Sequence, residues 1–456
     1  MSNTALLFLV LFFVGLLLAF VKHPIYGMLS YMLVFYMGPG EAWWAIDVPD
    51  FRWSLIAAAV TMIAAMRHPS PSSRPPWYTT APARWLIAIA LWLWIQTPWA
   101  LSPSDHVFMA SLFSKYLLLY AVLYTTLCEP KDIRHFVFAH IIGCFLWGYT
   151  AYLHPGSGRL ENIGYGDVAG SAFASMHMGT GLAFAGFAFL GTSGVLRWLA
   201  FSSIPFVLNA IILMATRGGF VGLLAGVPTA IYFSPKSRRR TVMLCLAMAP
   251  ILLVTLAHEL FWSRMSTMLE GDTLVTEGSA GTRIAVAQAN IEMFLDHPWG
   301  AGHRGNDLLS PRYLPPELLS PKDATKDGEP FRSAHNTLLA VLVDHGFIGL
   351  ILFVLLHVSV ARRLVRIRFH PPSPVAGELG AYAAALCTSL VVYWANAQFT
   401  NSAKAEVVIW IAALGCALEW MAAATRQSKA SEAEAGSSSE THQSQNVTIP
   451  SARLWL

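Results

Sequence analysis

The chain has 456 residues, of which 55% are hydrophobic and only 12% are charged, and its mean hydropathy is +0.51. An ordinary soluble domain carries roughly 25% charged residues, so this composition excludes a soluble globular protein and indicates an integral membrane protein. The net charge of +4 comes in short basic clusters, which suits control of membrane topology rather than nucleic-acid binding.

Long apolar runs recur along the whole chain. Inside a bilayer such runs satisfy their backbone groups only as helices or in a closed barrel, and these runs are too long and too uniformly apolar for barrel strands. We therefore predict an all-α integral membrane protein that folds as a multi-spanning helical bundle. In chain order, the expected helices are residues 4–21, 24–38, 53–66, 84–99, 108–127, 134–153, 171–191, 196–214, 219–233, 241–257, 336–360, 378–397 and 405–423.

The first apolar run, at residues 4–21, is long enough to be the core of a signal peptide. It lacks a basic start, and no small-residue cleavage site precedes the next run, so we interpret it as a retained helix. Counting it gives thirteen transmembrane helices with the N-terminus outside. The count is twelve if one of the two short N-terminal runs does not cross the membrane.

Two basic clusters set the expected orientation. PKSRRR at 235–240 and ARRLVRIR at 361–368 should both lie in the cytoplasm by the positive-inside rule. One helix out and one helix back separate them, which places the polar segment between them outside. The expected parts are N-terminal transmembrane helices (1–257), a long extracytoplasmic loop with an amphipathic helix and other short helices (258–334), C-terminal transmembrane helices (335–423) and a disordered cytoplasmic tail (424–456).

Several familiar kinds of active site are missing from the sequence. It has no G-x-x-x-x-G-K-[ST] phosphate loop, H-E-x-x-H zinc motif or G-x-S-x-G elbow, which argues against nucleotide hydrolysis and proteolysis. No His, Cys, Asp or Glu cluster with ligand spacing appears in the expected external segments, so we predict no metal or other cofactor. The cysteines lie in or at the ends of apolar runs and are expected to be small core residues: Cys128, Cys144, Cys245, Cys387 and Cys416.

One arginine lies where the positive-inside rule disfavours a cation. Arg217 falls in the turn between the helices expected at 196–214 and 219–233, and the orientation above places this turn on the external surface. Gly218 and Gly219 follow, where the second helix begins. Exposed N–H groups, the positive end of a helix and a guanidinium together suit phosphate oxygens. The alternative is an interfacial arginine that reaches lipid phosphates.

A second arginine lies in the long external loop. The segment GSAGTRIAVAQANIEMFLDHPWGAGHRGN predicts a helix that starts near Gly281 and breaks at Pro298. Arg283 lies in the first turn, where a cation opposes the helix dipole, so an anion held there would explain it better. A solvated loop arginine is the alternative.

A histidine precedes the helix expected at 336–360. His335 is placed at the external membrane surface, and the usual pKa of histidine suits a general base. A capping or interfacial histidine is the alternative. Ser333 or Asn336 can cap the helix that follows.

Asp344 is the carboxylate nearest to this histidine in the same apolar segment. At 100° per residue it should point to the opposite side of the helix from His335, so the two are not expected to form a dyad. Intramembrane carboxylates rarely face lipid, and we expect Asp344 to pair with a neighbouring helix. Gly346 and Gly349 indicate close helix packing or a kink.

These segments resemble the signature regions of a known family. ATRGGFVGLLAG, GTRIAVAQANIEMFLDHPWGAGHRGN and SAHNTLLAVLVDHGFIGL are similar in order, spacing and external placement to three regions of the O-antigen ligase and polymerase superfamily. The N-terminal segment that begins FVKHPIYGML resembles the exosortase-associated O-glycosylation ligase branch. Two departures are that Asp344 stands where the family more often has Glu, and that residues 155–180 lack an Asn-rich pattern.

The resemblance implies a membrane glycan ligase, a metal-independent, inverting glycosyltransferase of the bacterial cytoplasmic membrane. It would move a saccharide from a polyprenyl-diphosphate carrier to a hydroxyl of a lipid, glycan or protein acceptor on the extracytoplasmic face. Membrane lipids are expected partners, and nucleic acid is not. The implied site residues are the diphosphate contacts Arg217, Gly218, Gly219 and Arg283, the acceptor base His335, and the supporting residues Asn336 and Asp344.

Two other functions stay open at this point. A polysaccharide polymerase of the same superfamily would use a second lipid-linked glycan as acceptor, and the sequence does not separate it from a ligase. A flippase or transporter of lipid-linked saccharides would carry ionisable residues through the middle of many helices. The notable cations here cluster on one face instead, which favours an enzyme.

Overall fold

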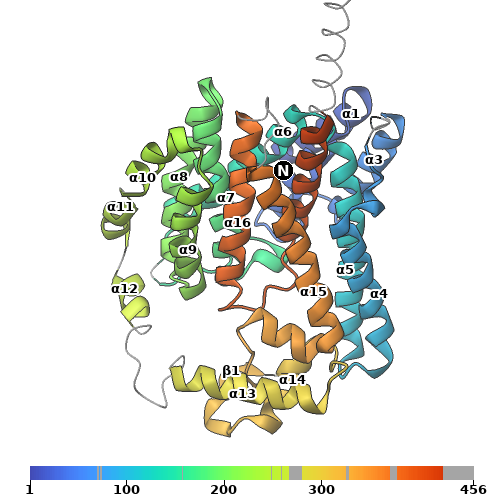
Figure 1. Ribbon diagram of the computed structural model, residues 1–456, viewed down its shortest axis with the longest axis vertical. Helices are drawn as coiled ribbons and strands as arrows, with labels where there is room; N and C mark the ends of the chain where they lie inside the picture. The colour runs from blue at the N-terminus through green and yellow to red at the C-terminus, as the bar shows by residue number, and fades with distance from the viewer. Residues whose placement is uncertain are drawn as a thin grey trace, which may run out of the picture.

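The computed structural model describes residues 1–68, 71, 74–156, 158–247, 249–257, 259–266, 280–324, 328–369 and 377–424. This part of the chain is almost wholly helical (Figure 1). Eight of its helices are long and apolar enough to cross a membrane, which confirms the predicted all-α membrane class. They are α1 (Asn3–Val21), α5 (Pro103–Thr126), α6 (Pro130–Leu153), α7 (Ser171–Gly191), α8 (Gly194–Met214), α15 (Thr337–Phe369), α16 (Glu378–Asn396) and the helix Val407–Ala424.

The other helices in the bundle are shorter. They are α2 (Ile25–Met37), α3 (Trp53–Arg67), α4 (Ala81–Gln96), α9 (Arg217–Phe233), α10 (Arg239–Ala247) and α11 (Ala249–Leu256). Each expected apolar helix therefore has a counterpart, although the one expected at 241–257 is described as two pieces. Length alone does not establish that these shorter helices cross the membrane, so twelve or thirteen spans stays a prediction.

Single turns of 3₁₀ helix connect several of these elements. They are η1 (Ala45–Asp47), η2 (Trp77–Thr79), η3 (Thr97–Trp99), η4 (Gly166–Val168), η5 (Lys236–Arg238) and η6 (Pro316–Leu318). Of the cysteines, all free, Cys144, Cys387 and Cys416 are buried as expected, Cys128 is half-buried and Cys245 is exposed. The predicted disordered tail lies outside the described residues, apart from Ala424.

Helix α16 forms the centre of the core. It packs against α7, α9 and α15, while α7 also packs against α8, and α4 lies along α15. The middle of α16 carries the run Ala383–Ala384–Ala385, whose members are all fully buried. Small side chains let neighbouring helices approach closely, and close packing is the main attraction between helices in lipid.

Most of the predicted external segment lies at one end of the bundle, at the bottom of Figure 1, whereas its first helix, α12 (Glu259–Ser266), lies at the left of the view below α11. The part at the bottom contains α13 (Ala280–Asp296), α14 (Gly305–Tyr313) and the antiparallel strands β1 (Ser320–Ala324) and β2 (Pro330–Phe331). Helix α13 is the amphipathic helix predicted to start near Gly281. Its buried face, including Val286 and Met293, packs with Leu309 of α14 and Val343 of α15. A small apolar core therefore joins α13 and α14 to the bundle.

Helix α15 is kinked near its N-terminal end. Gly346 has φ 68° and ψ −173°, a conformation that is essentially restricted to glycine. The turn at 298–300 lies against this kink, and Pro298 O accepts a hydrogen bond from Phe347 N at 3.1 Å. The kink is one of the two features that the sequence predicted for Gly346, and it changes the surroundings of Asp344.

Candidate functional site

A cavity of about 590 Å³ opens where four segments of the chain meet. It lies between the start of α9, the start of α13, the segment before α15 and the turn after α16. Four arginines and one histidine line it, and the described lining residues include no Asp or Glu. These cationic or basic side chains are Arg159, Arg217, Arg283, Arg332 and His335.

The cavity brings together most of the residues that the sequence predicted for the site. Gly218 and Asn336 line it along with the two predicted arginines and the histidine. Gly219 and Asp344 do not line it, as the local structure explains below. A volume of this size falls in the range of small-molecule binding sites.

The start of α9 supplies the first arginine. Thr216 caps this helix, and its hydroxyl accepts a hydrogen bond from Gly219 N at 3.1 Å, so that N–H is already engaged. A side chain at Gly218 would come within 2.9 Å of Asn396 Oδ1, which makes glycine necessary for this close packing. Ala215, just before the cap, has φ 45°. This left-handed residue makes the sharp turn from α8 into α9 that presents Arg217 to the cavity.

The start of α13 supplies the second arginine. Arg283 is exposed, and its guanidinium carbon lies 4.9 Å from the centroid of the Phe399 ring. Desolvation lowers the pKa of Arg283 from its usual value, but an arginine stays a cation at neutral pH. Phe399, in the turn after α16, therefore provides an aromatic face that holds this cation beside the cavity.

The histidine lies in a strained turn just outside α15. His335 has φ 47°, an uncommon conformation for a residue other than glycine and one that tends to occur at functional sites. Asn336 caps the helix, because its Oδ1 accepts hydrogen bonds from Leu338 N at 3.0 Å and Leu339 N at 3.1 Å. Its Nδ2 donates to Gln398 Oε1 at 3.0 Å. The cap predicted for Asn336 is thus present, and it ties the histidine turn to the segment after α16.

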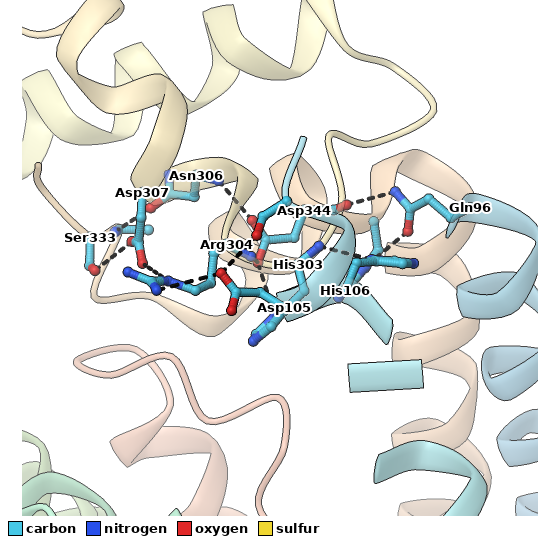
Figure 2. A network of polar contacts seen from close by, with 12 residues as sticks. Gln96, Asp105, His106, His303, Arg304, Asn306, Asp307, Ser333 and Asp344 are labelled. Atoms are coloured by element: carbon cyan, nitrogen blue, oxygen red, sulfur yellow. Dashed lines mark hydrogen bonds and ion pairs between the residues drawn. The ribbon is translucent and has the colours of Figure 1, made fainter. Parts of the chain in front are cut away.

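Helix α14 holds the other side of this turn (Figure 2). Asn306 Oδ1 accepts a hydrogen bond from Ala334 N at 2.8 Å, and Asp307 Oδ1 accepts one from the Ser333 hydroxyl at 2.6 Å. Ser310 Oγ accepts a third from Arg332 N at 2.8 Å. The pKa of Asp307 is raised above its usual value because the carboxyl is buried, and the hydrogen bond from Ser333 only partly opposes this shift. Three consecutive residues before His335 are therefore fixed by one turn of α14.

Asp344 fixes α14 in turn, and its partner is the start of a neighbouring helix, as the sequence predicted. Its buried carboxylate accepts hydrogen bonds from Asn306 N at 2.8 Å and Arg304 N at 3.1 Å, as Figure 2 shows. These N–H groups belong to the start of α14, where a helix leaves donors unsatisfied and favours negative charge. The helical-wheel argument does not apply to His335, which precedes α15, but Asp344 does not line the cavity that His335 lines.

The sequence analysis missed four lining residues that carry guanidinium or amide groups. Arg159 belongs to the segment 155–180, and its Nε lies 2.9 Å from Glu161 Oε1 and 3.1 Å from Met214 O. Arg332 and Gln398 come from loops that meet only in the folded chain. The one sequence signal for Asn396 was that it is a polar residue at the end of the apolar run 378–397.

Asn396 is unusual because its amide is fully buried and lines the cavity. Among the described residues, neither its Nδ2 nor its Oδ1 has a hydrogen-bond partner. A buried polar group without partners costs about 1–3 kcal/mol, and native structures hold few of them. Asn396 is therefore a candidate contact for a bound polar ligand.

Two clusters of potential metal ligands also exist among the described residues. His303, Asp344 and His345 form one, and His140, Cys144 and His177 form the other. The sequence analysis did not foresee either cluster, because neither has its ligands at the spacing of a metal motif, and the expectation of no metal stays a prediction. In the first cluster, Asp344 and His345 are neighbours in the sequence, and His303 joins them because the turn before α14 packs against the kink of α15.

Comparison with known proteins assigns a family to this part of the chain. A family model described as O-antigen ligase matches residues 201–354, which run from α8 into α15 and contain Arg217, Arg283 and His335. No curated protein gives a significant match to the chain. The likeness of the N-terminal segment to the exosortase-associated branch stays a prediction. The match to residues 201–354 supports the predicted likeness to the O-antigen ligase and polymerase superfamily.

Proposed function

We propose that this protein is a glycan ligase that transfers a saccharide from a polyprenyl-diphosphate carrier to an acceptor hydroxyl. The observation that carries the proposal is the cavity in which four arginines and a histidine converge without a lining carboxylate among the described residues. The family match supports glycan transfer of the ligase or polymerase kind. The cavity chemistry supports an anionic, phosphate-bearing donor.

In this proposal the diphosphate binds between the starts of α9 and α13. Arg217 and Arg283 present planar guanidinium groups that can bind phosphate oxygens bidentately. Gly218, in the first turn of α9, adds a backbone N–H at the positive end of the helix. Negative charge grows on the diphosphate as the anomeric C–O bond breaks, so these groups stabilise the transition state more than the ground state.

The acceptor hydroxyl is activated by His335 in this proposal. The histidine accepts the hydroxyl proton while the acceptor oxygen forms a bond to the anomeric carbon. The bond from that carbon to the diphosphate breaks on the opposite face, and the leaving group takes the electron pair. A single displacement of this kind inverts the anomeric configuration, and the step needs no metal ion because the arginines carry the charge of the leaving group.

The remaining polar residues of the cavity suit the saccharide. Asn396 and Gln398 carry amides, which can both donate to and accept from sugar hydroxyls. Asn396 has no hydrogen-bond partner among the described residues, so a sugar or a phosphate oxygen would satisfy it. Arg332 widens the cationic surface on the side of α14.

We place this cavity on the extracytoplasmic side of the cytoplasmic membrane. The positive-inside rule supports this placement, since the clusters at 235–240 and 361–368 belong to the opposite, cytoplasmic side. In intact cells, a cysteine at Asp323 should react with a membrane-impermeant thiol reagent, whereas one at Ser237 should not. Cys245→Ser is the suitable background, because the native thiol is exposed. Labelling at Ser237 alone would reverse the orientation.

The proposed reaction can be tested by reconstitution of the full chain into vesicles. A polyprenyl-diphosphate oligosaccharide of known anomeric configuration is the donor, and hydroxyl-bearing lipids, proteins and a second donor molecule are offered as acceptors. Mass analysis should show one acceptor gaining the saccharide while polyprenyl diphosphate is released, without added nucleotide, magnesium or manganese. Transfer to the second donor alone would identify a polymerase. Movement of intact donor across the bilayer without bond cleavage would identify a flippase.

A further inference from the structure

A second polar cluster lies beside the kink of α15, behind the turn that leads into α14. His303, Asp344 and His345 each offer a ligand atom, and these atoms all lie within 4.8 Å of one another. The same three residues line a cavity of about 30 Å³, which has room for one ion or water molecule. This small cavity shares no lining residue with the arginine cavity. We propose that it binds one divalent metal ion of the zinc type.

The ring of His345 is oriented to offer its Nε2 atom. Gln96 Nε2 donates hydrogen bonds to Asp344 O at 2.7 Å and Trp299 O at 3.3 Å, which fixes the amide. Gln96 Oε1 must then accept, and it lies 3.1 Å from His345 Nδ1. Nδ1 therefore carries the proton and Nε2 carries the lone pair. A hydrogen bond of this kind to the outer nitrogen is the usual support of a metal-binding histidine.

The ring of His303 offers a nitrogen that needs a partner. Its Nδ1 is buried and, among the described residues, has no hydrogen bond, although it lies 3.7 Å from Asp344 Oδ2. His303 N donates to His106 Nδ1 at 3.0 Å, which anchors the backbone here (Figure 2). His106 Nε2 lies 2.7 Å from Leu93 O, so both ring nitrogens of His106 are engaged. An ion between His303 and Asp344 would satisfy both residues.

The charge of the cluster favours a cation. Asp344 accepts two backbone N–H groups, and a carboxylate has further lone pairs for an ion. Asn401 also lines the cavity and brings an amide oxygen as a fourth donor. Lys404 lines it too, but its ammonium lies 6.0 Å from the centroid of the Phe173 ring on α7. Two imidazoles and one carboxylate are a ligand set typical of zinc.

The other group of potential metal ligands differs from the cluster at His303. His140, Cys144 and His177 are all buried inside the bundle. The Tyr36 hydroxyl lies between the two rings, 2.5 Å from His140 Nδ1 and 2.8 Å from His177 Nε2. That hydroxyl satisfies the histidines in the place where an ion would bind. In the cluster at His303, by contrast, His303 Nδ1 receives no hydrogen bond from a described residue.

A metal ion bound by His303, Asp344 and His345 would have a structural role. It would join the turn before α14 to the kink of α15, at the point where Asp344 already receives the N–H groups of Arg304 and Asn306. Because Asn306 holds Ala334, the ion would also stabilise the turn that carries His335. The proposal concerns metal binding and stability, so it stands or falls separately from the transfer reaction.

The test measures metal content of the purified full-length protein after equilibration with Zn²⁺ and removal of excess ion. Wild type should retain one zinc ion per chain, and Co²⁺ in its place should give the visible absorption of a histidine and carboxylate site. His303→Ala should lose the ion with little effect on folding, since its Nδ1 makes no hydrogen bond to a described residue. His297→Ala, on the same loop, is the matched control and should keep the ion.

Thermal unfolding supplies a second readout. Removal of zinc by prolonged chelation should lower the unfolding temperature of wild type but not that of His303→Ala, and added Zn²⁺ should restore it. Wild type that retains no zinc, or His303→Ala that retains as much as wild type, would overturn the proposal and leave a water molecule as the occupant of the cavity. The wild-type measurements decide the question even if a variant fails to fold.

Discussion

The arginine cavity and the cluster around Asp344 adjoin the same turn but differ in how their charged side chains are paired. In the cavity, four arginines converge and no carboxylate is found among the described lining residues. In the cluster, the carboxylate of Asp344 is buried and receives backbone N–H groups from α14. Cations gathered without a lining acid suit a ligand that brings negative charge, whereas a carboxylate satisfied by backbone donors suits a structural role.

The difference teaches how the binding side of the turn is kept in shape. Arg332 and His335 face the cavity, but the backbone between them is held by Asn306, Asp307 and Ser310 of α14. Groups that would contact the substrate are thus positioned by groups that do not line the cavity. Variants on the two sides should therefore fail in different ways, one in chemistry and the other in stability.

The largest effect is expected from Gly346→Ala, on the structural side. A side chain there would meet Pro298 O at 2.5 Å, and the backbone conformation excludes residues other than glycine. We expect a loss of at least ~3 kcal/mol of stability from strain and overpacking together, seen as a large drop in unfolding temperature. Gly186→Ala is the control, because a side chain there meets no atom within 4 Å. An unchanged unfolding temperature for Gly346→Ala would show that the fold does not depend on the kink at Gly346.

The next largest effect is expected from His335→Ala, on the binding side. Loss of a general base should lower transfer on the order of 100-fold or more, while donor binding and unfolding temperature stay near normal. Binding of the lipid-linked donor and product formation must be measured separately on the purified variant. His154→Ala, at another exposed histidine, should retain full transfer. Near-normal transfer by His335→Ala would exclude this histidine as the base.

A smaller effect is expected from Arg217→Lys, which keeps the charge but loses the planar fork. Donor affinity and transfer should both fall about 10- to 100-fold, the range for a lost charge-assisted hydrogen bond. Arg283→Ala should show the same kind of defect, since both residues are proposed to bind one diphosphate. Arg197→Lys, where the side chain lies over the Phe189 ring at 4.6 Å, should leave donor affinity unchanged. Full donor binding by both site variants would show that the diphosphate binds elsewhere.

The smallest effect is expected from Asn336→Ala, at the boundary between the two regions. The variant loses the cap of α15, which is worth ~1 kcal/mol, along with the contact to Gln398. We expect a modest fall in unfolding temperature and in transfer. Asn336→Asp keeps an oxygen that can cap the helix and should recover most of the stability. A variant Asn336→Ala as stable as wild type would show that neither the cap nor the contact to Gln398 stabilises the turn.

The sequence predicted the fold and the cavity where local rules sufficed. Apolar run lengths gave the helices, and helix-end chemistry gave the places of Arg217, Arg283 and Asn336. The positive-inside rule put those residues at one end of the bundle, which is why three distant segments could be expected to meet. Regular periodicity and end effects are properties of one segment at a time.

The rest depended on contacts between segments. The neighbouring element that Asp344 contacts could not be named, because its partners Arg304 N and Asn306 N lie about forty residues away in the sequence. Arg159 and Asn396 were missed because their place in the cavity follows from tertiary packing. Gly219 was assigned a free N–H because the cap by Thr216 could not be distinguished from an open helix end.

The most direct test of the central claim is an experimental structure of the full chain with polyprenyl diphosphate bound. The account predicts that phosphate oxygens lie within hydrogen-bond distance of Arg217 and Arg283, near Gly218 N, with the scissile oxygen facing the side of the cavity that carries His335. Diphosphate bound outside the arginine cavity, with these side chains pointing away from it, would contradict the account.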